Sequence, residues 1–199
     1  ILTRGGGILN DGGVLTLSRV TMRNNHTIDT SDAVGSSDVV GGGAVANTGN
    51  GKLTATHCRF IGNVASGGLK YAFGGAIANV SDSIAVIKKR VFVRNEAMGG
   101  SPSYGGAIGN FGSSQLTVSG STFRSNAARA FNSLTASGQK AFGGAIATRP
   151  GTVVSSGSAT TIDRSLFIGN RALGGAAGDD EAGGDAGGGA LYSVASTLT

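Results

Sequence analysis

The stretch that decides the fold is Gly74-Gly75-Ala76-Ile77-Ala78-Asn79, followed by Phe92-Val93-Arg94-Asn95. Both blocks recur along the chain in the same order: the first appears six times and the second follows five of these copies. A repeated pair of this kind indicates a small unit stacked on copies of itself, because one unit is too small to bury its apolar residues alone.

The two blocks keep a nearly fixed distance from each other. The glycine pairs are Gly5-Gly6, Gly42-Gly43, Gly74-Gly75, Gly105-Gly106, Gly143-Gly144 and Gly188-Gly189. The second block pairs Met22 with Asn25, Phe60 with Asn63, Phe92 with Asn95, Phe123 with Asn126, and Phe167 with Asn170. From glycine to aromatic or Met the steps are 17, 18, 18, 18 and 24 residues, and from there to the next glycine pair they are 20, 14, 13, 20 and 21. The variable half predicts protruding loops at 26–41, 127–142 and 171–187, because surface loops accept insertions at little cost.

Alternate residues between the blocks are apolar, as at Ala85 and Ile87 before Phe92. Period two with β-branched residues predicts strands with one buried face. Stacked in parallel about 4.8 Å apart, equivalent residues lie above one another. We therefore expect one internal stack of the four phenylalanines with Met22, and another of Ile8, Val45, Ile77, Ile108, Ile146 and Leu191. The asparagines Asn25, Asn63, Asn95, Asn126 and Asn170 are expected to form a hydrogen-bonded ladder at a turn.

Composition agrees with a folded β chain. Glycine accounts for 37 of 199 residues, which disfavours helices, and it does not recur at every third position as in collagen. Hydrophobic residues make up 39% and charged residues 14%, the reverse of a disordered chain. We treat 1–199 as a single solenoid segment, either part of a longer chain or a stacking subunit.

Charge and cysteine usage limit the partners. The net charge is +5, but Lys and Arg are scattered apart from the run Lys88-Lys89-Arg90, and aromatics are 6%. This indicates a solvated basic face rather than a nucleic-acid groove, which needs stacking residues between the cations. Cys58 lies in an apolar stretch and is interpreted as a small buried hydrophobe. No apolar run reaches the roughly 20 residues of a transmembrane segment.

The paired motifs, Gly-Gly-Ala-apolar as in Gly74–Ile77 and Phe-x-x-Asn as in Phe92–Asn95, resemble the repeat of the polymorphic outer-membrane proteins, whose passengers are secreted autotransporters. The stretch from Gly5 to Leu17 also resembles repeats of large bacterial surface proteins. The resemblance covers nearly the whole chain. It implies a right-handed β-helix, export to the cell surface, and a role in adhesion or the envelope. The fold class we predict is all-β, a right-handed parallel β-helix (β-solenoid) of about five to six coils with protruding loops.

Catalytic chemistry has little support in the sequence. A polysaccharide lyase or hydrolase needs carboxylates close together, as an acid/base pair or as calcium ligands. Asp11, Asp82 and Asp163 fall at different repeat positions, and His26 and His57 have no acidic partner in phase. We predict no catalytic residue and no cofactor. The acidic cluster Asp179, Asp180, Glu181 and Asp185 is a calcium candidate, but its place in a variable loop favours a solvated loop. A threonine column for ice binding, which includes Thr16 and Thr54, is interrupted by Val86.

The expected function is that of a non-catalytic, extracellular structural or adhesive solenoid of the bacterial cell surface. Its partners would be copies of itself, joined through the solenoid ends into an oligomer or filament, and a host-surface or glycan ligand. A polysaccharide-binding or polysaccharide-cleaving β-helix is the alternative. Release of reducing sugar from acidic polymers would favour that alternative.

Overall fold

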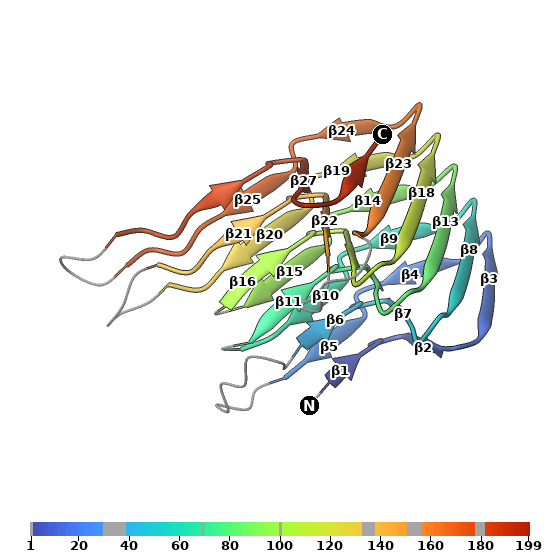
Figure 1. Cartoon of the computed structure of the whole chain (residues 1–199), viewed down its shortest axis with the longest axis horizontal. Coiled ribbons are helices and arrows are strands. Elements are labelled where there is room, and N and C mark those ends of the chain that lie inside the picture. Colours follow the sequence, from blue (N-terminus) through green and yellow to red (C-terminus); the bar gives the residue numbers. More distant parts are fainter. Residues whose placement is uncertain are drawn as a thin grey trace.

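A computed structural model describes residues 2–29, 39–68, 70–99, 101–132, 138–150, 157–177 and 182–199. These residues form strands and no helix, wound into a right-handed parallel β-helix (Figure 1). A complete coil contributes one strand to each of five parallel sheets, numbered here 1 to 5 in chain order. The fold class predicted from the repeat is confirmed.

The strands of each sheet follow the coils in order. Sheet 1 contains β1 (Leu2–Arg4), β6 (Val39–Gly41), β11 (Tyr71–Phe73), β16 (Ser101–Tyr104), β21 (Ala141–Phe142) and β26 (Ala186–Gly187). Sheet 2 contains β2 (Ile8–Asp11), β7 (Val45–Thr48), β12 (Ile77–Asn79), β17 (Ile108–Phe111), β22 (Ile146–Arg149) and β27 (Leu191–Ser193). Sheet 3 contains β3 (Val14–Ser18), β8 (Lys52–Thr56), β13 (Ile84–Lys88), β18 (Gln115–Ser119), β23 (Ala159–Asp163) and β28 (Thr197–Leu198).

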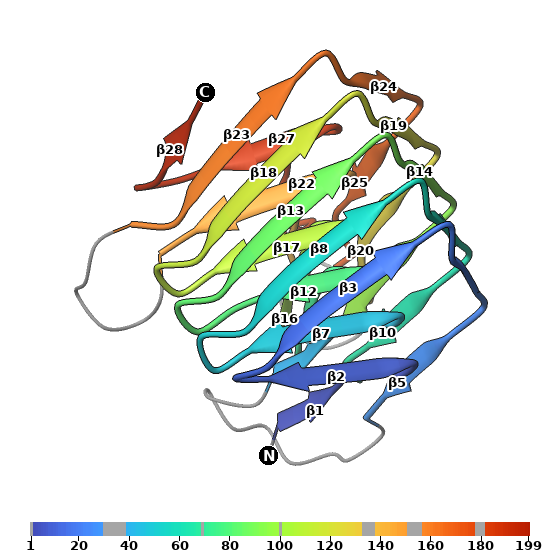
Figure 2. The same cartoon turned by 90° about the vertical axis from the view of Figure 1, so that its right-hand side faces the viewer.

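The last two sheets close the coil. Sheet 4 contains β4 (Thr21–Arg23), β9 (Arg59–Ile61), β14 (Val91–Val93), β19 (Thr122–Arg124) and β24 (Leu166–Ile168). Sheet 5 contains β5 (His26–Ile28), β10 (Val64–Ser66), β15 (Glu96–Gly99), β20 (Ala127–Ala130) and β25 (Arg171–Leu173). Figure 2 faces sheet 3, whose strands lie side by side like rungs.

Sheets 2, 3 and 4 enclose the main core, and the predicted register is confirmed. Phe60, Phe92, Phe123 and Phe167 stack with ring centroids 4.6–4.9 Å apart and planes within 7°. Met22 pairs with Phe60 and continues the column. The column from Ile8 to Leu191 faces the same core from sheet 2. The distance between stacked rings equals the distance between coils. The same residue types therefore recur, because each side chain packs on the equivalent residue of the next coil.

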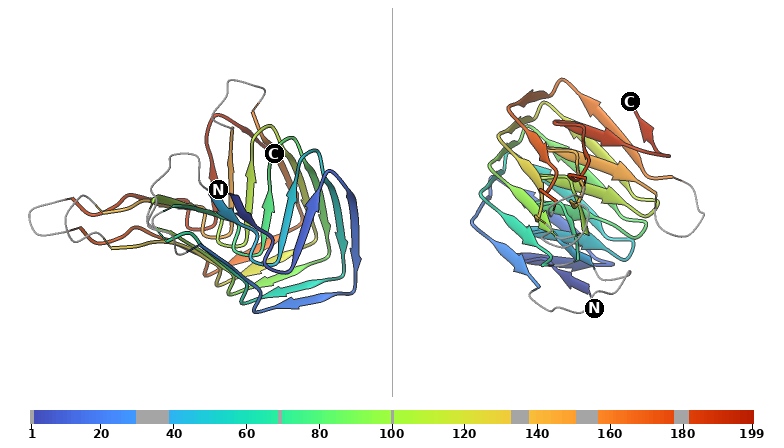
Figure 3. Two further views of the ribbon diagram at one scale, coloured as in Figure 1. Left: turned by 90° about the horizontal axis from the view of Figure 1, so that it is seen from below. Right: turned by 90° about the vertical axis from the view of Figure 1, so that its left-hand side faces the viewer.

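Sheets 1 and 5 leave this core and run beside each other as an arm (Figure 3). Small residues face the partner sheet, such as Ala128 and Ala130 against Ala141, so the two layers lie close. The segments predicted as plain loops, 26–41, 127–142 and 171–187, therefore begin and end in strands of the arm. Their central residues 30–38, 133–137 and 178–181 lie outside the described part of the chain.

The glycine pair of each coil turns the chain from sheet 1 into sheet 2, and the two glycines serve different purposes. Gly74 has φ +59°, a conformation that favours glycine. A Cβ on Gly75 would lie 2.3 Å from the Gly106 carbonyl oxygen and 2.4 Å from the Glu96 carbonyl, so backbone approach excludes any side chain. The pair thus supplies both a bend and a close backbone approach.

The predicted asparagine ladder is present at the turn between sheets 4 and 5. Asn63 donates from Nδ2 to Asn95 Oδ1 (2.9 Å), and its backbone N–H donates to the same oxygen (3.0 Å). The Nδ2 group of Asn95 also donates to the carbonyl of Phe60 (3.0 Å). The same pattern joins Asn25 to Asn63, Asn95 to Asn126 and Asn126 to Asn170.

A second ladder, which was not predicted, follows sheet 2. Asn10, Asn47, Asn79 and Asn110 are linked by Nδ2–Oδ1 bonds of 2.6–2.8 Å. Where the next coil has Thr148 instead, Asn110 donates to Thr160 Oγ1 (3.1 Å), which is hydrogen-bonded to Thr148 Oγ1. The sequence signal was the final Asn of the Gly-Gly block, which is present in the first four of its six copies.

Candidate functional site

One side of the solenoid carries most of its exposed positive charge. We call it the basic face: the last residue of each sheet 3 strand, the turn between sheets 3 and 4, sheet 4 itself, and the turn into sheet 5. Its exposed cations are Arg19, Arg23, Arg59, Lys88, Lys89, Arg94, Arg124 and Arg164. Asp163 is the only acidic residue in the five segments 18–25, 56–63, 88–95, 119–126 and 163–170 that build the face, all of them described. Eight positive charges and one negative give a net +7, against +5 for the whole chain.

The register explains this concentration. Arg19, His57, Lys89, Gly120 and Arg164 occupy the same turn position in successive coils, each with φ between 43° and 56°. These residues are spread over 145 positions of sequence, yet stacking places them about 4.8 Å apart along one line. Three cations that look scattered in the sequence, Arg19, Lys89 and Arg164, therefore lie in one row along the solenoid axis, with His57 and Gly120 between them.

Gly120 interrupts that row and opens a notch. A hollow of about 290 Å³ is lined there by Lys88, Lys89, Ser119, Gly120 and Arg164. A Cβ on Gly120 would meet nothing closer than the Lys89 Cγ at 3.8 Å, so the missing side chain leaves open space. No ion pair joins Lys88 or Lys89 to an acidic side chain in the described residues. Arg164 bonds from Nε to Asp163 Oδ2 (2.8 Å), and both side chains are more than half exposed. Water screens such an exposed ion pair strongly, so the pair contributes little to stability.

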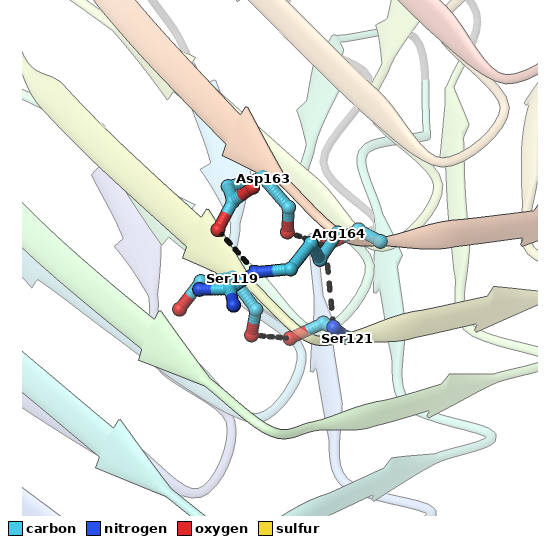
Figure 4. Close-up of polar contacts among 5 residues, drawn as sticks. Ser119, Ser121, Asp163 and Arg164 are labelled. Carbon is cyan, nitrogen blue, oxygen red and sulfur yellow. Dashed lines mark hydrogen bonds and ion pairs between the residues drawn. The ribbon is translucent and has the colours of Figure 1, made fainter.

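A serine network ties the turn that follows Ser119 to the turn that follows Asp163 (Figure 4). The Ser121 hydroxyl donates to the Ser119 carbonyl (3.0 Å), and the Ser121 N–H donates to the Ser165 hydroxyl oxygen (3.2 Å). The Ser165 hydroxyl donates in turn to the Asp163 carbonyl (2.9 Å). The turn is thus tied within its coil and to the next one, which fixes the backbone that carries the cations.

A second hollow of about 260 Å³ lies at the next turn, between sheets 4 and 5. Ser125, Gly169, Arg129 and Arg171 are among its lining residues. Arg129 is engaged with Glu96 (2.8 Å), whereas Arg171 forms no ion pair among the described residues. This hollow extends the positive region around the corner.

Arg90, the third cation of the sequence run, does not belong to the basic face. It is 1% exposed and donates from Nε to the Ala55 carbonyl (2.9 Å) and from Nη1 to the Lys89 carbonyl (3.1 Å). Its Nη2 has no partner, and burial lowers the pKa of Arg90 to about 10, partly countered by Cys58. Cys58 is buried as predicted, with its Sγ accepting from the Val20 N–H (3.4 Å).

The other predicted candidates do not converge. Asp179, Asp180 and Glu181 lie outside the described residues, and Asp185 pairs with Lys140 (2.6 Å). Asp11 pairs in register with Thr48 and Asp163 with Ser119, at different positions of the coil. His26 and His57 are exposed. In the described ranges no three His, Cys, Asp or Glu side chains are placed to hold a metal ion.

An aromatic cluster fills the inner angle between sheets 1 and 2. Phe73 stacks on Phe111 (centroids 4.2 Å), and Tyr104 on Phe142 (5.4 Å), which stacks in turn on Tyr192 (4.6 Å). Arg149 donates to the Tyr104 hydroxyl (2.6 Å) and lies over its ring. Burial raises the pKa of Tyr104. The rings pack on one another, so this cluster anchors the arm to the body.

The described part of the chain has no helix long and apolar enough to span a bilayer. Comparison with protein families, curated proteins and solved structures finds no match for this chain.

Proposed function

We propose that this chain is a non-catalytic structural or adhesive β-solenoid of the bacterial cell surface, which acts by presenting a fixed array of side chains. The observation that carries the proposal is the basic face: columns of exposed side chains held on a frame that two asparagine ladders join from coil to coil. The resemblance of its Gly-Gly-Ala and Phe-x-x-Asn motifs to those of exported bacterial repeats supports the surface location.

Four of the six described carboxylates also favour binding over catalysis. Glu96, Asp163 and Asp185 are each held in ion pairs with a basic side chain, and Asp29 pairs with the buried Lys70 (2.8 Å). A glycoside hydrolase instead places two carboxyl groups across one sugar bond, roughly 5–10 Å apart. Among the described residues, no such pair lines either of the two hollows.

Two measurements test the proposal. Antibodies raised against the chain are expected to label intact, unpermeabilised cells of the organism that makes it, and beads coated with the chain are expected to adhere to a glycan-bearing surface. Incubation with pectin or alginate is expected to release no reducing ends and no unsaturated products. Labelling only after permeabilisation, or steady product release, would overturn the proposal.

The alternative, a β-helix that binds or cleaves acidic polysaccharide, has one specific observation in its favour. The positively charged notch at Gly120 has the charge that an acidic sugar would need. Binding without cleavage fits both the adhesive proposal and this observation.

A further inference from the structure

We propose that the basic face binds one strand of a linear acidic polysaccharide laid along the solenoid axis, with an anionic group seated in the notch at Gly120. The inference rests on the proposed adhesive role and names its ligand class. The placement of charge on the face, the shape of the face and the absence of stacking residues support this ligand class.

Charge placement comes first. The row of turn positions runs about 19 Å over five coils, since each step is about 4.8 Å. Cations flank this row on both sides, so a polymer lying along it meets positive charge in every coil. A ligand with one or two anionic groups would use only a small part of such a surface. Repeated weak contacts along a polymer add up, as in any multivalent interaction.

The notch supplies a seat for one anionic group. Lys88 and Lys89 on one side and Arg164 on the other stand on either side of Gly120, two coils apart at the extremes. Charge-assisted hydrogen bonds from ammonium and guanidinium groups to a carboxylate or sulfate are about twice as strong as neutral ones. Ser119 lines the same hollow.

Nucleic acid fits this face less well. Single-stranded nucleic acid is held by aromatic side chains between the cations. In the segments that build the face, Phe60, Phe92 and Phe123 are fully buried in the core, and the partly buried Phe167 stacks on Phe123 in the same column. Phosphates of a duplex wind away from a straight row, so only a few of them could reach it at once.

The experiment measures binding of a fluorescent oligogalacturonate, long enough to span five coils, to the full chain by anisotropy. The fully methyl-esterified oligomer provides the uncharged probe, and a duplex DNA of equal length provides the competing polyanion. The native chain is expected to bind the oligogalacturonate at least about tenfold more tightly than its ester, an affinity that falls as salt rises.

Lys88→Glu and Lys52→Glu form a matched pair. Both residues are exposed on strands of sheet 3 and change the net charge equally, but Lys52 begins β8 at the far end of the sheet. Lys88→Glu is expected to weaken binding about tenfold and Lys52→Glu less than about twofold. Gly120→Asn fills the notch without changing charge, and the same backbone conformation is occupied by Lys89 and Arg164 in the neighbouring coils. It is expected to weaken binding severalfold with an unchanged melting temperature.

Three outcomes would overturn the inference: equal affinity for the acid and its ester, equal losses in the two lysine variants, or tighter binding of the duplex. Its failure is distinguishable from failure of the proposed function. A chain that labels intact cells and coats adhesive beads, yet ignores oligogalacturonate, retains the adhesive role and lacks this ligand.

Discussion

At the residue scale, a buried asparagine of the ladder uses the full hydrogen-bonding capacity of its side chain. The amide of Asn95 accepts two hydrogen bonds from Asn63 and donates two, to Phe60 and Asn126, all without exposure to solvent. A buried polar group left without its partner costs roughly 1–3 kcal/mol. The ladder therefore specifies the register as strictly as the phenylalanine stack does.

Asn95→Leu keeps the approximate size of the side chain. It is expected to lower the free energy of unfolding by several times the cost of one unpaired buried group, because four partner groups each lose one hydrogen bond. Asn170→Leu removes the outermost member, where water reaches the partly exposed side chain, and is expected to cost much less. Urea unfolding followed by circular dichroism measures both. Equal losses would contradict the ladder as a source of stability.

Arg90 is a residue whose charge opposes folding. With one guanidinium nitrogen unpartnered and the pKa lowered to about 10 by burial, the charged form is less favourable inside than in water. The buried charge of Arg90 lowers the stability of the fold below pH 10, and this destabilisation is relieved as the pH rises through the folded pKa toward the unfolded value.

Arg90→Met keeps the length of the side chain and removes the buried charge. Replacing buried ionic groups by apolar ones of similar volume is often neutral or stabilising by about 1–4 kcal/mol, so the melting temperature is expected to stay or rise. Arg90→Ala leaves a cavity and is expected to lower it. A Met variant as unstable as the Ala variant would show that the guanidinium bonds to Ala55 and Lys89 outweigh the desolvation.

At the scale of the element, the Gly-Gly turn makes the arm possible. The second glycine of the pair lies at backbone contact distance from the first residue of a sheet 5 strand, as Gly75 does from Glu96. Gly75→Ala is expected to prevent native folding or lower the melting temperature severely. Gly120→Ala, where the added Cβ meets open space, is expected to have an effect of about 1 kcal/mol. Thermal denaturation compares the two; a mild Gly75→Ala phenotype would contradict the close approach.

At the scale of the whole molecule, the solenoid has strand edges that this chain does not pair. In sheet 3, β3 pairs only with β8. The N–H of Lys52 donates back to the Gly13 carbonyl of the preceding coil, so the equivalent N–H groups of β3, at Val14 and two residues on at Thr16, point to the open side. Such an edge pairs with another strand, whether from a further coil or from a second copy.

We expect the 199-residue chain to associate end to end in solution, with a sedimentation coefficient that rises with concentration. Thr16→Pro removes one edge donor without touching the β3–β8 bonds and is expected to shift the chain toward monomer, whereas Thr16→Val keeps the N–H and is expected to leave association unchanged. Analytical ultracentrifugation measures all three. A native chain that stays monomeric at every concentration would contradict self-association through this edge.

The sequence by itself determined the coil. Gly-Gly and Phe-x-x-Asn repeat because stacked copies must match, so period alone predicted the parallel solenoid, the phenylalanine stack and the first asparagine ladder. Only the tertiary structure decided which side of the molecule is basic. Arg19, Lys89 and Arg164 lie in different coils, and nothing local links them. Stacking turns their separation of 70 or more residues into one of about 10 Å, which is two coils, and the same stacking buried Arg90, which the sequence placed among exposed cations.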